Sequence, residues 1–292
     1  MREQFPELVY GFDFKRIDLD EKHFVVYTDS GEKTGETILF VHGLMSYIPA
    51  WAKVIPELSK TFRCIAIDLP GYGKSSGGVN PGTVSFYVDI LVKFVKKLNL
   101  GKVNLAGHSM GGQIAIAMAL KHPELIKKLI LLAPAGFETF SFFENVMIKK
   151  YASPKMFQDA SEEQIRKSWA GNFFRMPEEV AEMLKDSLEM KRWGGFGDYC
   201  EVVYNSVLGL LKEPVFSSLK KLNCRTLIFF GKDDAQIPNR YIHKNTTPEE
   251  IAKKGASEIR NAKLVLIEQC GHFIQYEKPD VVIREMQSFL EE

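Results

Sequence analysis

Residues 105–115, LAGHSMGGQIA, place one serine among three glycines, between an apolar run and an alanine-rich segment. The residues before them indicate a buried strand that ends at about Ala106, and the spacing from about Met110 onward predicts a helix. Ser109 would therefore occupy the turn between a strand and a helix. A sharp turn of this kind brings backbones close together and favours glycine on either side of the serine. The hydroxyl would be held above the sheet, beside helix N–H groups that stabilise negative charge.

Working outward from this turn, short apolar runs alternate with longer amphipathic segments. Two early segments, at 12–19 and 23–29, alternate apolar and polar residues as antiparallel strands do. Continuous apolar runs, typical of strands covered on both faces, are found at 36–42, 62–68, 102–107, 127–133, 225–231 and 262–268. Helical spacing is found at 50–60, 82–99, 110–121 and 279–291. The alternation predicts an α/β fold with a mostly parallel central sheet flanked by helices.

The alternation breaks once, between Gly136 and Pro214, where helical patterns follow one another. This segment is also rich in aromatic side chains and methionine, including Trp169 and Trp193. We predict a helical cap insertion at 136–215 in a core formed by residues 1–135 and 216–292.

Charge and composition restrict the partners. The net charge is +1 with acids and bases interspersed, and no basic stripe indicates nucleic acid. No polybasic or amphipathic segment indicates a membrane surface, and no apolar run reaches about 18 residues. The beginning of the chain does not resemble a signal peptide. The four cysteines are widely spaced without a CxxC pair, as free thiols of a reducing cytoplasm are. We expect a cytoplasmic protein with a small-molecule partner and no nucleic-acid or membrane partner; the oligomeric state stays open.

A serine hydroxyl becomes an effective nucleophile when a histidine acts as its general base and a carboxylate orients that histidine. His272 follows the last predicted strand, at the sheet edge where Ser109 would emerge. Asp233 and Asp234 follow the preceding strand, so the chain order is serine, aspartate, histidine. His108 adjoins the serine, but neighbouring side chains on a tight turn point apart, and we interpret it as structural.

Five motifs resemble those of the α/β-hydrolase fold superfamily, in the single-cap group of carboxylesterases, haloperoxidase-like esterases and carbon–carbon bond hydrolases. They are LFVHGL, DLPGYGKS, GHSMGG, GKDDAQIP and CGHF, within 37–135 and 222–292. The resemblance implies oxyanion-hole N–H groups on Leu44 and Met110 and a supporting role for His42. Similar hydrolases place the acid three residues after a glycine and four before a proline, which implies Asp234 as the acid.

The resemblance implies a serine hydrolase that cleaves a small or medium apolar carboxylic ester through an acyl-enzyme. The sequence has no cysteine and histidine cluster at metal-ligand spacing and no dinucleotide fingerprint, so we expect no metal or other cofactor. Trp169, Trp193 and Phe273 are the candidate pocket residues. Carbon–carbon hydrolases of ring-cleavage products are an alternative, although they usually carry tryptophan where this chain has Phe273. A ligand receptor of the same fold and a perhydrolase side activity are further alternatives. Residues 239–248 look like an extra loop that could border the site.

Overall fold

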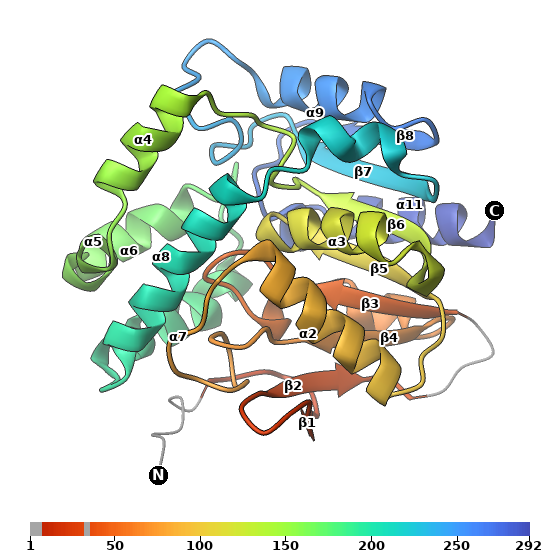
Figure 1. Ribbon diagram of the computed structural model, residues 1–292, viewed down its shortest axis with the longest axis horizontal. Helices are drawn as coiled ribbons and strands as arrows, with labels where there is room; N and C mark the ends of the chain where they lie inside the picture. Colours follow the sequence, from red (N-terminus) through yellow and green to blue (C-terminus); the bar gives the residue numbers. More distant parts are fainter. Residues whose placement is uncertain (1–7, 32–35) are drawn as a thin grey trace.

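The apolar runs form the eight strands of one sheet in the computed structural model, which describes residues 8–31 and 36–292 (Figure 1). The strands are β1 (Lys15–Asp18), β2 (Phe24–Asp29), β3 (Thr37–Val41), β4 (Arg63–Ile67), β5 (Val103–His108), β6 (Ile126–Leu132), β7 (Arg225–Gly231) and β8 (Ala262–Ile267). Their order is β1-β2-β4-β3-β5-β6-β7-β8. β2 is antiparallel to β1 and β4, and every pairing from β4 to β8 is parallel. The predicted fold class, a mostly parallel α/β sheet, is confirmed.

Helices cover both faces of this sheet, so the central strands are apolar throughout. On one face α2 (Val84–Lys97) packs on α3 (Met110–Lys121), which contacts β3, β5 and β6. The opposite face carries α11 (Pro279–Glu291), which contacts β7 and α1 (Ile55–Leu58) (Figure 1). Between these layers, the side chains of Ile38, Leu39, Phe40 and Val41 in β3 are completely buried.

Two local predictions differ from the structure, and one helix was not predicted. The helix expected at 50–60 is broken into a 3₁₀ turn, Ile48–Trp51, and the short α1, because Pro56 has no N–H to continue one helix. Strand β5 runs to His108, two residues beyond the expected end, since Gly107 and His108 still pair with β6. Helix α9 (Pro248–Ser257) was not expected, although Thr247 and Glu250 form a capping box at its start.

Between β6 and β7 the chain forms a group of helices at one end of the sheet (Figure 1). They are α4 (Phe142–Tyr151), α5 (Pro154–Asp159), α6 (Glu162–Ala170), α7 (Ala181–Arg192) and α8 (Phe196–Lys212). Helix α5 packs on α8, α6 packs on α7, and α8 also reaches α2 of the core. The division into a core and a cap at 136–215 stays a prediction.

Within the described ranges, no helix is both long and apolar enough to cross a membrane. All four cysteines are free, and burial raises the pKa values of Cys64 and Cys200 to about 12.

Candidate active site

Ser109 directly follows β5 and is the N-cap residue of α3, so it lies at the carboxyl edge of the sheet. Its φ of 52° is in the left-handed region, which is costly for a residue with a Cβ. Backbone hydrogen bonds hold it there: its N–H donates to the Leu132 carbonyl at 3.0 Å, and its carbonyl accepts from Gly112 and Ala135 at 2.9 Å and from Gln113 at 3.3 Å. The turn therefore fixes the serine without using its hydroxyl.

The glycines on either side of Ser109 permit this turn. A Cβ on Gly107 would lie 2.3 Å from the Gly111 carbonyl oxygen, and one on Gly111 would lie 2.3 Å from the Val41 carbonyl oxygen. Those obstacles are backbone atoms, which cannot rotate away as a side chain can. Helix α3 can approach β3 and β5 this closely only because both positions lack side chains.

His272 and Asp234 are paired at the same edge of the sheet. The Nδ1 atom of His272 lies 2.7 Å from Oδ2 of Asp234, and both residues are buried. Oδ1 of Asp234 accepts the N–H groups of Gln236 at 2.7 Å and Ile237 at 3.1 Å, so the carboxylate is fixed in orientation. The backbone N–H of His272 donates to the Asn172 carbonyl at 2.7 Å. These contacts leave Nε2 as the ring nitrogen free of the carboxylate.

Two other histidines lie close to the site in positions that do not suit a general base. His108 is buried, with Nε2 3.0 Å from the His272 carbonyl oxygen, and burial holds its pKa well below the ordinary value. His42 accepts the Leu69 N–H on Nε2 and contacts the Gly43 carbonyl oxygen through Nδ1 at 2.8 Å. Burial lowers the pKa of His42 to about 4, so its ring is neutral and braces the loop after β3.

The loop after β3 lies against Ser109. A Cβ on Gly43 would come within 3.1 Å of the Ser109 Cβ, and the next residue, Leu44, lines the cavity in front of the serine. The hydroxyl of Tyr47 donates to Asp186 of α7, which ties this loop to the helices α4–α8 between β6 and β7, named the inserted helices from here on. Met110 is the first residue of α3, where a backbone N–H has no partner within the helix.

A cavity of about 1300 Å³ lies between the carboxyl edge of the sheet and the inserted helices, and both Ser109 and His272 line it. Trp169 and Phe273 also line it, with their ring centroids 5.8 Å apart. Trp193 was expected there but is absent from the lining that the described residues form. A Cβ on Gly195 would lie 2.3 Å from the ring of Trp193, because this ring folds back over the start of α8.

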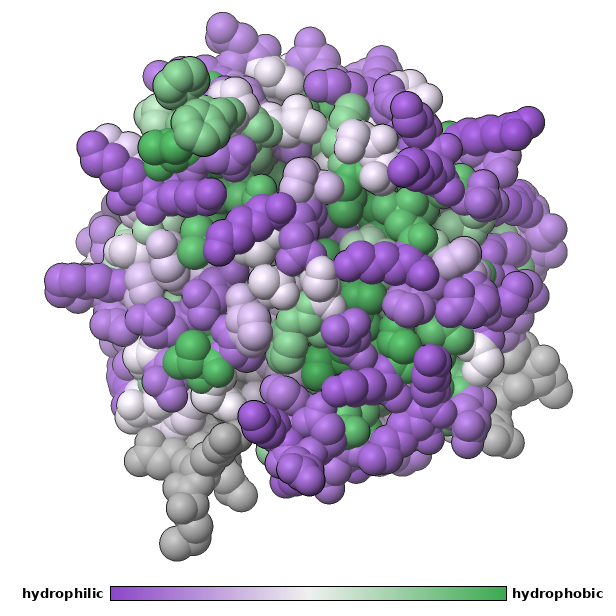
Figure 2. Space-filling view, in the orientation of Figure 1, coloured by the Kyte–Doolittle hydropathy of each residue, from purple (hydrophilic) through white to green (hydrophobic). Residues whose placement is uncertain are grey.

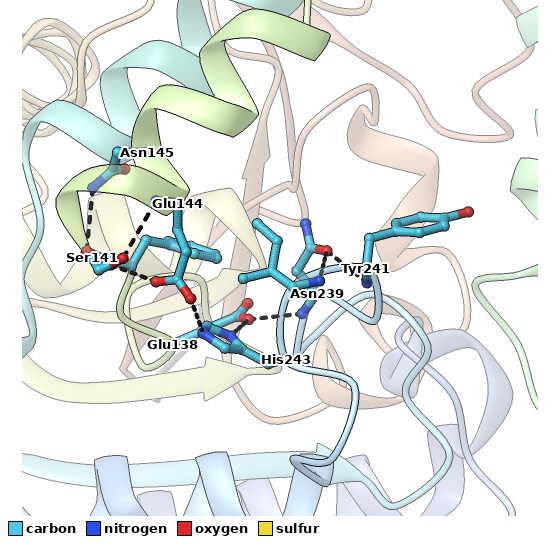
Figure 3. A network of polar contacts seen from close by, with 9 residues as sticks. Glu138, Ser141, Glu144, Asn145, Asn239, Tyr241 and His243 are labelled. Carbon is cyan, nitrogen blue, oxygen red and sulfur yellow. Dashed lines mark hydrogen bonds and ion pairs between the residues drawn. The ribbon is translucent and has the colours of Figure 1, made fainter.

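A polar network that the sequence did not reveal borders the cavity at another point (Figure 3). Nδ1 of His243 lies 2.5 Å from Oε1 of Glu138, and the same carboxylate accepts the Asn239 N–H at 2.8 Å. Burial raises the pKa of Glu138, while these two contacts oppose the shift. Asn239 and Tyr241 line the cavity, so the extra loop at 239–248 does border the site. No motif marks Glu138 or His243, because their partnership joins segments about one hundred residues apart.

The cavity lining contains acidic side chains but no lysine or arginine among the described residues. The acidic side chains are those of Glu138, Asp159 and Asp186. Among residues 8–31 and 36–292 no group of three histidine, cysteine, aspartate or glutamate side chains could hold a metal ion.

Comparisons with known proteins agree with the observed fold. A family model described as "alpha/beta hydrolase fold" matches residues 36–279. The chain is 26% identical to an (E)-2-((N-methylformamido)methylene)succinate hydrolase of Acinetobacter baylyi, over 95% of this chain and 98% of that one. It is 28% identical to a 2-hydroxy-6-oxononadienedioate/2-hydroxy-6-oxononatrienedioate hydrolase of Pseudomonas putida, over 90% of each chain. A thermophilic esterase of Thermogutta terrifontis has a TM-score of 0.75 and 25% identity, over 96% of this chain and 98% of that one.

Proposed function

Because the chain belongs to the alpha/beta hydrolase family, we propose that it is a serine hydrolase that cleaves an uncharged, apolar carboxylic ester. The observation that carries this proposal is the fixed Asp234–His272 pair, because His272 lines the same cavity as Ser109 at the end of β5. The absence of basic side chains from the described lining supports an uncharged substrate.

In the proposed reaction, Nε2 of His272 takes the proton of the Ser109 hydroxyl as the oxygen attacks the ester carbonyl. Asp234 holds the tautomer that leaves Nε2 free and stabilises the imidazolium that forms. The N–H groups of Leu44 and Met110 stabilise the oxyanion. His272 then protonates the leaving alcohol, and water cleaves the acyl-enzyme by the same steps.

Aromatic side chains and the size of the cavity support an apolar substrate. The cavity volume of about 1300 Å³ exceeds the range of ~300–1000 Å³ that is typical of small-ligand pockets. The cavity therefore has room for an acyl chain of medium length together with its alcohol.

Carbon–carbon bond hydrolysis is a second candidate, favoured by the name of the Pseudomonas putida relative. That name denotes a substrate with two carboxylates. The described lining offers no lysine or arginine to pair with such a dianion, so burying its two charges there would go uncompensated. We therefore rank ester hydrolysis above carbon–carbon bond hydrolysis. Separately, we propose that the protein is located in the cytoplasm.

The test uses p-nitrophenyl esters of increasing acyl length and a 2-hydroxy-6-oxo dienoate, with wild type and Ser109→Ala. We expect turnover of the esters, covalent labelling of Ser109 by a fluorophosphonate, and loss of both in Ser109→Ala. Turnover of the dienoate alone would replace the ester proposal with the second candidate. Unchanged ester turnover by a folded Ser109→Ala protein would contradict the nucleophile.

A further inference from the structure

Helix α4 has two faces that differ in what they contact. On the inner face, Asn145 and Ile148 line the cavity and Glu144 approaches His243. The outer face is apolar: Phe142 is 76% exposed and Phe143 is 79% exposed. The other exposed apolar side chains of the helix are Val146, Met147 and Tyr151. Large apolar side chains on the water-facing side of a helix are unusual in a soluble protein and indicate an interaction surface.

Figure 2 shows an apolar group protruding from the molecule over α4, with hydrophilic side chains around it. Lys149 and Lys150 follow in the last turn of the helix and are exposed. An apolar face bordered by lysines suits a lipid surface, where the rings enter the acyl boundary and the ammonium groups meet anionic headgroups. Lysine is depleted at protein–protein interfaces, so this combination favours a lipid surface over a protein partner.

The structure fixes this helix in place at its N-terminal end. Oε1 of Glu144 lies 3.4 Å from Nε2 of His243, whose other ring nitrogen contacts Glu138 (Figure 3). Ser141 and Glu144 also form a capping box. The outer face is thereby presented away from the cavity while the inner face remains part of the cavity wall.

We propose that the outer face of α4, formed by Phe142, Phe143, Val146, Met147 and Tyr151 with Lys149 and Lys150, docks on an anionic lipid surface. Docking there places the wall of the cavity beside the lipid layer, from which an acyl ester can enter the apolar cavity. The sequence alone suggested no membrane surface, because nothing in the pattern showed which side of α4 is covered. The docking step does not depend on the proposed ester chemistry.

Vesicle sedimentation tests this directly. Wild-type protein should sediment with phosphatidylglycerol vesicles, bind phosphatidylcholine vesicles more weakly, and dissociate as salt is added, since salt screens exposed charges. The double substitution Phe142→Ser with Phe143→Ser should lower the partition coefficient at least about tenfold. Lys149→Glu with Lys150→Glu should lower it at least about tenfold on anionic vesicles.

Matched controls lie at the opposite edge of the sheet or on another loop. Lys96→Glu with Lys102→Glu, at exposed lysines near the start of β5, should bind as wild type does. Val79→Ser, at a side chain that is 57% exposed, should also leave binding unchanged. All variants should keep the wild-type circular dichroism spectrum and turnover of a water-soluble ester.

No binding of wild type to either vesicle, or equal losses in the control variants, would overturn the proposal. Self-association abolished by the phenylalanine substitutions, without any vesicle binding, would overturn it in favour of a second copy as the occupant. Sedimentation measures binding and not hydrolysis. Vesicle binding by a protein that cleaves no ester would therefore overturn only the proposed function.

Discussion

Asp233 and Asp234 are adjacent in sequence but have opposite surroundings. Asp234 is buried, contacts His272 and accepts two backbone N–H groups. Asp233 is exposed, and its N–H donates to the Cys270 carbonyl at 3.0 Å. The turn after β7 thus directs one carboxylate to the imidazole and the other to water.

This difference predicts unequal effects of two otherwise identical substitutions. Asp234→Asn should lower kcat by about four orders of magnitude, by analogy with the equivalent change in a serine protease, because an amide favours the wrong imidazole tautomer. Asp233→Asn should cost about tenfold or less, roughly 1.4 kcal/mol in the barrier. Steady-state ester kinetics would measure both. The reverse order, in variants with native circular dichroism spectra, would contradict the assignment of the acid.

The inserted helices position two tryptophans differently. Trp169 of α6 lines the cavity, and its indole N–H donates to the Ser187 hydroxyl of α7 at 3.0 Å. Trp193, between α7 and α8, packs against the start of α8 instead. One ring therefore contributes to the cavity wall and the other to the packing of the helices themselves.

Alanine substitutions should separate these two roles. Trp169→Ala should change the ratio of kcat/KM between long and short p-nitrophenyl esters by at least about tenfold, since the wall that meets the acyl chain is altered. Trp193→Ala should lower the unfolding free energy by about 3 kcal/mol while leaving that ratio unchanged. A proportional loss on every ester in Trp169→Ala would show that this ring acts through packing and not through the cavity wall, and a changed ratio in Trp193→Ala would contradict its assignment to helix packing.

At the scale of the whole molecule, Asp68 joins three parts of the chain. Its carboxylate accepts the Ile48 N–H at 2.8 Å, the Lys74 N–H at 2.9 Å and the Tyr10 hydroxyl. Asp68 is completely buried, and burial raises its pKa from 3.8 to about 7. The folded protein thus binds this proton more tightly than the unfolded chain does.

Stability should therefore depend on pH in a defined direction at this carboxyl. Its contribution is fully present below the unfolded pKa and is lost as the pH rises from 3.8 to about 7. Relative to Asp68→Asn, which cannot titrate, the wild-type unfolding free energy should fall across that window. At ~1.4 kcal/mol per pKa unit, the fall should be at most a few kcal/mol. Urea unfolding of both proteins across this range measures the difference; a difference that grows with pH would contradict the raised pKa.

The local sequence determined the sheet and the turn at Ser109. Each predicted strand formed: the two alternating segments became the antiparallel strands β1 and β2, and the continuous apolar runs became the parallel strands that are covered on both faces. Glycines at 107 and 111 predicted close backbone contacts, and those contacts are present. The strands and the turn depend on short stretches of sequence and on the spacing of their apolar residues, so both can be identified without a tertiary structure.

Only the tertiary structure decided which distant side chains meet and which faces stay open. The pairing of Glu138 with His243 joins two loops that no shared pattern connects. The many aromatic residues in 136–215 did not show which of them reach the cavity. Trp169 lines the cavity, whereas Phe142 and Phe143 face water. Periodicity shows that a helix has an apolar side. Whether protein, substrate or solvent covers that side depends on how the helices pack against one another.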